Sequence, residues 1–368
     1  MITDFNLKQL IYPLQDWYLQ NARTLPWRED PTPYHVWVSE IMLQQTRVEA
    51  VKPYYLRFMN ALPDIRSLAE CPEDQYLKLW EGLGYYSRVR NLHAAACQVM
   101  EQFGGRLPED YQDLLKLKGI GSYTAGAIAS QAFHKAVPAV DGNVFRVLTR
   151  VTGDDTDISK AAFRTQVEQI LKKLMEEEIQ NNLNPSVFNQ GLMELGATVC
   201  VPNGEARCSS CPWAVFCRAR LENRIPLLPV KKKAKERRIE ERTVLLICDN
   251  HKIAIHKRPS SGLLAGLYEF PNLAGHLSEK DVIAFIREIG YSPLRIRRLS
   301  DSKHIFSHIE WHMIAYQLLV EEEAFASASQ LELRKDYHLF FVDQSEQKKS
   351  FAVPSAFAAY KNYEQDER

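Results

Sequence analysis

Two carboxylic acids in the chain have sequence surroundings that suit acid–base chemistry. Glu40 lies in VWVSEIMLQQT among apolar residues, and such surroundings raise the pKa of a carboxyl group, which makes it a competent acid near neutral pH. Asp141 opens the amphipathic segment DGNVFRVLTR, where an aspartate ordinarily caps a helix. A solvated helix glutamate and a plain helix cap are the simpler interpretations, so neither residue alone identifies a reaction.

Four of the seven cysteines lie within 18 residues, in CVPNGEARCSSCPWAVFC. In a reducing compartment their spacing, C-x7-C-x2-C-x5-C, indicates a metal centre rather than disulfides. Thiolates suit both a 4Fe-4S cluster and a tetrahedral zinc ion. Zinc sites more often contain two C-x2-C pairs and only one is present, so the spacing favours iron and sulfur. The candidate ligands are Cys200, Cys208, Cys211 and Cys217.

Two glycine-rich segments could approach a nucleic acid closely. LLKLKGIGSYTAGAIAS places Gly119 and Gly121 in a turn between helical stretches, and the amides that open the second helix can hold an anion. In WEGLGYYSRVRNL, Tyr85 and Tyr86 could enter a base stack while Arg88 and Arg90 hold the backbone. An ordinary helix–turn–helix and tyrosines packed in the core are the alternative interpretations.

The elements that position these residues fall into two halves of different composition. Residues 1–220 have apolar positions at helical spacing, which predicts a mostly α half, with one helix running from Val36 to Val48. Residues 221–240 contain two prolines and the run KKKAKERR, which is typical of a linker. Beyond them, TVLLIC and KIAIHKR predict a β-hairpin, DVIAFIREIG a short helix and IEWHMIAYQLLV a strand.

Length and composition limit the class of protein. A chain of 368 residues with 45% hydrophobic and 25% charged residues is long enough for about two or three domains and is not disordered. Its apolar runs are far shorter than the roughly 20 residues that cross a bilayer, and its start lacks the pattern of a secretory signal. These features predict an intracellular protein without a membrane partner. Because 46 basic residues balance 46 acidic ones, any nucleic acid must be bound by local patches.

In combination these motifs resemble the adenine DNA glycosylases of the MutY type, within the helix-hairpin-helix DNA glycosylase superfamily. The resemblance covers nearly the whole chain. One departure is visible, because the first cysteine interval is seven residues and the family usually has six. The matching motifs, in chain order, are LPWR (25–28), VSEIMLQQT (38–46), WEGLGYYSR (80–88), GIGSYTAGAI, VDGNV, the four cysteines, LLAGLYEFP and FSH.

The resemblance implies a multidomain fold. A mostly α helix-hairpin-helix glycosylase domain is expected at residues 1–222 and includes the iron-sulfur loop at 200–217. A basic linker at 223–241 then leads to an α+β Nudix-like domain at 242–368. That domain lacks the acidic motif of Nudix hydrolases around REIG at 287–290, so lesion recognition without pyrophosphatase activity is expected.

The implied activity is removal of adenine mispaired with 8-oxoguanine or guanine, by a monomeric 4Fe-4S enzyme acting on double-stranded chromosomal DNA in the cytoplasm. Glu40 would protonate adenine N7 and assist water. Asp141 would stay ionised and stabilise the sugar cation or a covalent adduct, as in retaining glycosidases. Tyr123 and Asn143 would orient the site.

The resemblance also implies which residues contact the DNA. Four are expected to line the adenine pocket: Arg23, Trp27, Arg28 and Gln190. Four are expected beside the orphaned 8-oxoguanine: Gln45, Thr46, Leu83 and Tyr85. Backbone amides of Gly119 and Gly121 would bind a phosphate. Phe306, Ser307 and His308 would recognise the lesion.

Three other functions remain as alternatives. An endonuclease III-like glycosylase and lyase for oxidised pyrimidines would need a lysine where this chain has Tyr123, because a Schiff base requires an amine. A catalytically inactive iron-sulfur DNA-binding protein would not need both Glu40 and Asp141. A nucleotide hydrolase would need the acidic metal ligands that the C-terminal half lacks.

Overall fold

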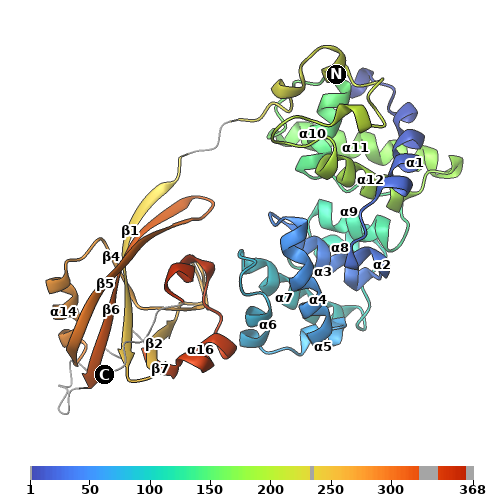
Figure 1. The fold of residues 1–368 in the computed structure, drawn as a ribbon. Helices are drawn as coiled ribbons and strands as arrows, with labels where there is room; N and C mark the ends of the chain where they lie inside the picture. Colours follow the sequence, from blue (N-terminus) through green and yellow to red (C-terminus); the bar gives the residue numbers. More distant parts are fainter. Residues whose placement is uncertain (1, 233–235, 323–338, 362–368) are drawn as a thin grey trace. The chain divides into compact units, whose positions relative to one another are not determined.

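The computed structural model describes residues 2–232, 236–322 and 339–361 (Figure 1). A helical part is followed by a mixed sheet with helices, as the change of composition near residue 220 predicts. Lys233 and Lys235 of the predicted basic linker lie outside the described residues.

Contacts between residues divide the chain into two compact units. Unit 1 comprises Met1–Cys71 and Ser87–Lys233, and unit 2 comprises Pro72–Tyr86 and Ala234–Arg368. The segment Pro72–Tyr86 therefore packs with the C-terminal half, although the predicted glycosylase domain includes it.

Unit 1 consists of short helices whose ends are set by capping side chains and prolines. Asp110 and Asn184 each accept a backbone hydrogen bond at a helix N-terminus. Pro33 and Pro185 occupy first-turn positions, where no intrahelical hydrogen bond is lost. The helices are α1 (Ile11–Asn21), α2 (Pro26–Glu29), α3 (Pro33–Leu43), α4 (Val48–Ala61), α5 (Ile65–Ala69), α7 (Ser87–Gln102), α8 (Tyr111–Lys116), α9 (Ser122–Gln131), α10 (Gly142–Thr152), α11 (Ala161–Glu178), α12 (Pro185–Thr198) and α13 (Arg218–Leu221).

The core around α1, α10, α11 and α12 fixes the helices that carry the site. Phe145 and Leu192 are almost completely buried in it, and each such side chain contributes about 1.5–3 kcal/mol. Trp213 joins this core from the cysteine-rich loop and donates its indole N–H to the Leu10 carbonyl at 2.9 Å. The loop is thereby anchored to the same core as α10 and α12.

The helix predicted from Val36 to Val48 is two helices, α3 and α4. The chain turns between them, where Gln45 has a φ of 58°, a left-handed value that ends a helix. Arg88 donates to three carbonyls at the end of α3, those of Ile41, Met42 and Gln44, at 2.9, 2.9 and 2.7 Å. The sequence suggests that Arg88 holds a DNA backbone. Arg88 is only 8% exposed, however, and its guanidinium caps α3 instead.

Unit 2 is a seven-stranded sheet covered on both faces, which agrees with the predicted α+β class. The order is β3-β2-β1-β6-β5, with β4 paired to β1 and β7 to β2; β1 and β6 are parallel and the other pairs antiparallel. The predicted hairpin is β1–β2, and the predicted strand is β6. The strands are β1 (Arg238–Asp249), β2 (Lys252–Lys257), β3 (Tyr268–Glu269), β4 (Asn272–Ala274), β5 (Tyr291–Ile305), β6 (Ile309–Glu322) and β7 (Phe340–Asp343).

Helices cover the sheet of unit 2 through two apolar clusters. The predicted short helix is α14 (Glu279–Glu288), whose Val282 and Ile286 pack on one cluster. The 3-10 helix Ser355–Tyr360 contributes Phe357 to the other cluster. Further helices of this unit are α6 (Glu73–Leu79) and α16 (Gln344–Ser350).

Ion pairs attach α6 and the turn after it to the rest of unit 2. Lys257 Nζ lies 2.9 Å from Asp74 Oδ1, and Lys361 Nζ lies 2.6 Å from Glu81 Oε1. The Glu81 carboxylate also accepts from the Val353 amide at 3.2 Å. The segment that carries Leu83 and Tyr85 is therefore tied to the C-terminal half by side-chain contacts.

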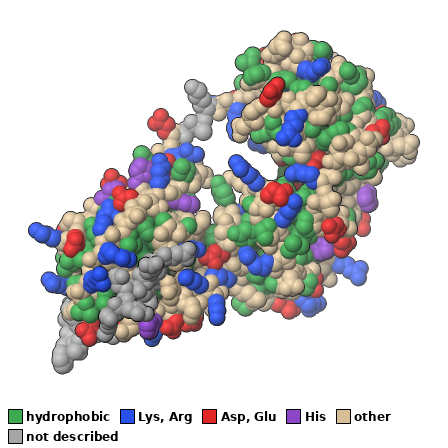
Figure 2. All heavy atoms as spheres, viewed as in Figure 1, with side chains coloured by type: hydrophobic (Ala, Val, Ile, Leu, Met, Phe, Trp, Pro, Cys, Tyr) green, Lys and Arg blue, Asp and Glu red, His purple; other side chains and the backbone are tan. Residues whose placement is uncertain are grey.

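Charged side chains of both signs are interspersed over the visible faces of the two units (Figure 2). This distribution agrees with the equal numbers of basic and acidic residues. Among the described residues, no helix has the length and apolar character that crossing a membrane requires.

Candidate active site

A cavity of about 730 Å³ in unit 1 gathers most of the predicted catalytic and base-binding residues. Its walls come from helices α2, α3, α9, α10 and α12, which are far apart in the sequence. The predicted residues that line it are Arg23, Trp27, Arg28, Glu40, Gln45, Thr46, Tyr123, Asp141, Asn143 and Gln190.

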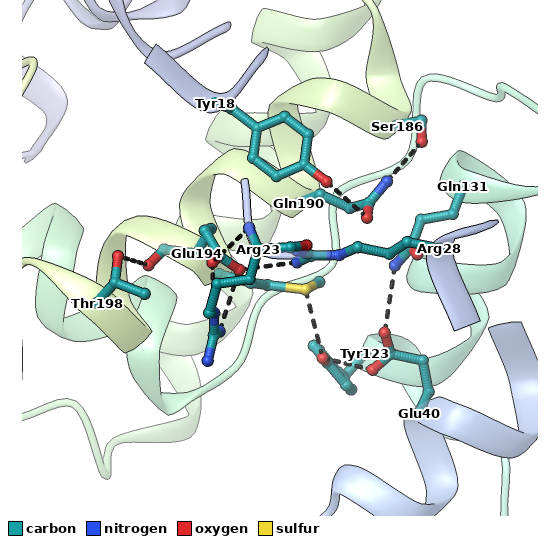
Figure 3. Close-up of polar contacts among 11 residues, drawn as sticks. Tyr18, Arg23, Arg28, Glu40, Tyr123, Gln131, Ser186, Gln190, Glu194 and Thr198 are labelled. Atoms are coloured by element: carbon teal, nitrogen blue, oxygen red, sulfur yellow. Dashed lines mark hydrogen bonds and ion pairs between the residues drawn. The ribbon is translucent and has the colours of Figure 1, made fainter. Parts of the chain in front are cut away.

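Glu40 is a buried acid with two hydrogen-bond donors. It is 5% exposed, and it accepts from the Tyr123 hydroxyl at 2.6 Å and from the Gln131 amide at 3.2 Å (Figure 3). Burial raises the pKa of Glu40, although both hydrogen bonds act in the opposite direction. Burial and the neighbouring Glu40 also raise the pKa of Tyr123 well above its ordinary value, so the phenol keeps its proton and remains a donor.

Asp141 caps α10, as its place before an amphipathic segment predicts. Oδ1 accepts from the Val144 amide at 2.8 Å, and Oδ2 accepts from the Asn143 side-chain amide at 2.7 Å. The Arg146 guanidinium donates to Asn143 Oδ1 at 2.9 Å, which fixes the orientation of that amide. Asp141 therefore caps α10 and lines the cavity at the same time.

The segment before Asp141 is held by tight packing and by a buried amide. Asn189 of α12 is fully buried; it donates to the Val137 carbonyl at 2.8 Å and accepts from the Ala139 amide at 3.1 Å. On the other side, a Cβ atom at Gly126 would lie 2.1 Å from the Pro138 carbonyl oxygen. Only a glycine at this position of α9 lets the segment pass so closely.

Glu194 is a site residue that sequence reasoning missed. It is 1% exposed and pairs with Arg23 Nε at 2.5 Å and with Arg28 Nη2 at 2.9 Å (Figure 3). Burial alone would raise the pKa of Glu194, but the two guanidinium groups outweigh it and hold the pKa below its ordinary value. The signal that identified Glu40, a carboxyl group among apolar residues, also exists for Glu194 in GLMELGA.

Gln190 lies one helical turn before Glu194 and is oriented by two hydroxyl groups. The Tyr18 hydroxyl donates to Gln190 Oε1 at 2.9 Å, and Gln190 Nε2 donates to Ser186 Oγ at 3.0 Å (Figure 3). Trp27 is 6% exposed and packs edge-on against Tyr55 with ring centroids 5.4 Å apart. The predicted base-binding wall is therefore well ordered.

The predicted hairpin joins α8 and α9. Gly119 has a φ of 76°, and a Cβ atom there would lie 2.6 Å from Asn91 Cβ, so glycine is required. Gly121 caps α9 in an extended conformation with open space where a side chain would be. The first amides of α9 are accessible to an anion at this end.

The four cysteines lie on one loop beside α10. Burial and then the neighbouring thiols raise the pKa of Cys217, and the pKa of Cys211 is raised to about 12 mainly by burial. Arg150 of α10 donates to Cys200 Sγ at 3.3 Å. Within the described residues, no three His, Cys, Asp or Glu side chains converge on a single metal ion.

The remaining predicted DNA-contacting residues belong to unit 2. Ser307 and His308 are exposed at the tip of the β5–β6 hairpin, where Phe306 packs against Trp311 with ring centroids 5.1 Å apart. Tyr85 is 45% exposed with a φ of 47°, whereas Leu83 is 7% exposed.

Comparison with known proteins gives matches to both halves of the chain. The sequence model of the HhH-GPD superfamily base excision DNA repair proteins matches residues 38–176, and that of the NUDIX domain matches residues 242–361. The adenine DNA glycosylase of Mus musculus is 34% identical over 86% of this chain and 71% of its own length. That of Buchnera aphidicola subsp. Baizongia pistaciae is 33% identical over 83% of this chain and 85% of its own. The solved structure of a thermostable thymine-DNA glycosylase is 25% identical and has a TM-score of 0.52 over 58% of this chain and 96% of its own.

Proposed function

Because this chain belongs to the adenine DNA glycosylases of the HhH-GPD superfamily, we propose that its substrate is adenine paired with 8-oxoguanine, or with guanine, in duplex DNA. The observation that carries the proposal is one cavity in which a buried acid, Glu40, lies near a separate carboxylate, Asp141. Two such groups suffice for hydrolysis of a purine glycosidic bond, because one protonates the leaving base and the other stabilises the positive charge on the sugar. The cavity is complete within unit 1, which supports a monomeric enzyme.

In the proposed reaction the two carboxyl groups act at different atoms. After adenine has been flipped out of the stack, Glu40 donates its proton to N7, which makes the base a better leaving group. Asp141 stabilises the positive charge that develops on the sugar, or forms a transient bond to it, and water then attacks. Tyr123 keeps Glu40 in place, and Asn143 does the same for Asp141.

The base would be held by the wall opposite these acids. Gln190 offers an amide to the edge of adenine, and Glu194, paired with Arg28, offers a carboxylate that accepts from its exocyclic amine. Trp27 supplies an apolar surface. Because Glu194 is already bound to two guanidinium groups, adenine would share its oxygen atoms with them.

Contacts to the rest of the DNA are proposed in both units. In unit 1, the amides near Gly119 and Gly121 bind a phosphate, and Gln45 and Thr46 contact the opposite strand. In unit 2, the proposed contacts come from the turn after α6 and from the tip of the β5–β6 hairpin. These residues are Leu83, Tyr85, Phe306, Ser307 and His308.

We propose a 4Fe-4S cluster on the four cysteines, Cys200, Cys208, Cys211 and Cys217. Four thiols on one loop with a single C-x2-C pair suit a cluster, in which each sulfur binds a different iron, better than tetrahedral zinc, which more often uses two such pairs. The hydrogen bond from Arg150 to Cys200 would stabilise a thiolate ligand. When bound, the cluster would crosslink the loop.

A duplex cleavage assay tests this function against the lyase alternative. Tyr123 cannot form a Schiff base, so the enzyme should leave an abasic site that is cut only after alkali treatment. Adenine opposite 8-oxoguanine should be released under single-turnover conditions without borohydride-trappable cross-links. Efficient trapping on thymine glycol opposite adenine would instead establish a lyase for oxidised pyrimidines.

A further inference from the structure

Behind Gln190 and Arg28 lies the phenol of Tyr18, a residue of α1 that is 7% exposed and does not line the cavity. Its hydroxyl donates to Gln190, and the Arg28 guanidinium lies over its ring, 5.5 Å from the centroid (Figure 3). Tyr18 therefore contacts two residues of the adenine-binding wall without reaching the base.

The Gln190 amide is held at both ends, by Tyr18 and by Ser186. A side-chain amide rotated by 180° exchanges its oxygen and nitrogen with almost no change of shape. Its hydrogen-bond partners alone therefore determine which position the oxygen occupies. A phenol donates more strongly than it accepts, because the ring withdraws electron density from its oxygen. Burial also raises the pKa of Tyr18, so its hydroxyl keeps the proton that it donates.

We propose that Tyr18 is a positioning residue that sets the adenine specificity of the cavity by fixing the orientation of the Gln190 amide. In that orientation Gln190 retains one oxygen lone pair and one N–H for a ligand. Adenine presents its N6 amine beside a ring nitrogen, which is the complementary pair. Guanine presents a carbonyl oxygen where adenine has the amine, and this oxygen would oppose the oxygen of Gln190. The inference rests on the proposed binding of adenine beside Gln190.

The test is Tyr18→Phe, which removes the hydroxyl and keeps the ring beneath Arg28. Single-turnover release rates are measured for adenine and for unsubstituted purine, which lacks the N6 amine, each opposite guanine. The adenine rate should fall by about 2- to 12-fold, the factor that corresponds to one net hydrogen bond of about 0.5–1.5 kcal/mol. The purine rate should change much less, so the adenine-to-purine ratio should fall. A merely structural role would slow both bases equally.

Tyr12→Phe is the matched control, because Tyr12 lies on the same helix, is 46% exposed and donates to the Asn181 carbonyl away from the cavity. Its ratio should equal that of the wild type. Ser186→Ala removes the other anchor and should lower the ratio in the same direction. Adding Tyr18→Phe to Gln190→Ala should leave the ratio of that variant unchanged.

An equal loss for both bases in Tyr18→Phe, or an unchanged ratio in both Tyr18→Phe and Ser186→Ala, would overturn the role of Tyr18. Because every substrate has guanine opposite the target base, this outcome is independent of any preference for 8-oxoguanine. If the wild type and Gln190→Ala have the same adenine-to-purine ratio of release rates, the proposed recognition by Gln190 is overturned, and with it the role of Tyr18.

Discussion

Glu40 and Asp141 differ in how the chain surrounds their carboxyl groups. Glu40 is enclosed by apolar side chains and donors, whereas Asp141 lies at a helix N-terminus on the cavity wall. In the proposed reaction, a proton donor and a group that stabilises a positive charge require different surroundings of this kind. The neighbours of each residue in the sequence were enough to predict this difference. The apolar neighbours of Glu194 could have singled it out in the same way, but its ion pair with Arg23, 171 residues away, leaves no sign in the spacing of the sequence.

At the residue scale, Glu40→Gln should stop base release while making the protein more stable at neutral pH. The rate should fall at least about 100-fold, because glutamine cannot donate the proton. The raised pKa of Glu40 means that the folded state retains a proton that the unfolded state releases, so wild-type stability declines as pH rises above the ordinary glutamate value. Glutamine removes this dependence.

Urea unfolding at about pH 5 and about pH 8 measures this effect, alongside single-turnover rates. The difference between the two unfolding midpoints should shrink in Glu40→Gln, and the exposed Glu101→Gln on α7 should behave like the wild type. In the wild type, base release should also slow as pH rises through the pKa of Glu40. A variant with near-normal rates would remove Glu40 from catalysis.

At the scale of elements, the helices were predictable from apolar spacing but their interruptions were not. The break after α3 depends on a left-handed Gln45 and on capping by Arg88, which reaches it from α7. A non-glycine residue at positive φ leaves no mark in the sequence, and a cap from a distant helix exists only after folding. The association of Pro72–Tyr86 with unit 2 likewise depends on contacts with residues far along the chain.

Gly126→Ala should test how α9 positions the segment that leads to Asp141. The added carbon would meet the Pro138 carbonyl oxygen at 2.1 Å, so the helix and the segment must separate. Such overpacking costs typically about 1–3 kcal/mol, and a displaced Asp141 should also slow base release. Gly121→Ala has open space around the new atom and loses only a favourable helix cap, so its unfolding midpoint should stay much nearer that of the wild type. Equal stability of the two variants would contradict the close packing.

The cysteine loop should bind iron. Purified protein should be brown, absorb broadly near about 400 nm and contain about four irons per chain. Cys211→Ser should lose iron, whereas Cys97→Ser, in a thiol outside the loop, should retain it. Stoichiometric zinc without iron in anaerobically prepared wild type would overturn the cluster.

At the scale of the whole molecule, equal numbers of basic and acidic residues mean that DNA binding must come from local contacts. In the proposed substrate the adenine itself is undamaged, so the opposite 8-oxoguanine would be recognised separately, by its C8 oxygen and its N7 hydrogen. The hydroxyl and amide groups at the exposed tip of the β5–β6 hairpin suit that edge. In the proposed function, chemistry in unit 1 and lesion recognition in unit 2 are separable.

Replacing Phe306, Ser307 and His308 together by alanine should lower the preference for 8-oxoguanine over guanine by about 5-fold or more, since one good base contact is worth about 1–3 kcal/mol. Adenine release opposite guanine should change little. Alanine at His251 and Lys252, exposed on the β1–β2 hairpin of the same unit, should leave the preference intact. An unchanged preference in the triple variant would move lesion recognition to Thr46 and Leu83.

The most direct measurement is the single-turnover rate of base release by the full chain from three duplexes: adenine opposite 8-oxoguanine, adenine opposite guanine, and thymine glycol opposite adenine. The account predicts fastest release from the first duplex, slower release from the second by about 5- to 150-fold, and none from the third. Equal rates on the first two duplexes would contradict lesion recognition, and release of thymine glycol with strand cleavage would contradict the proposed substrate itself.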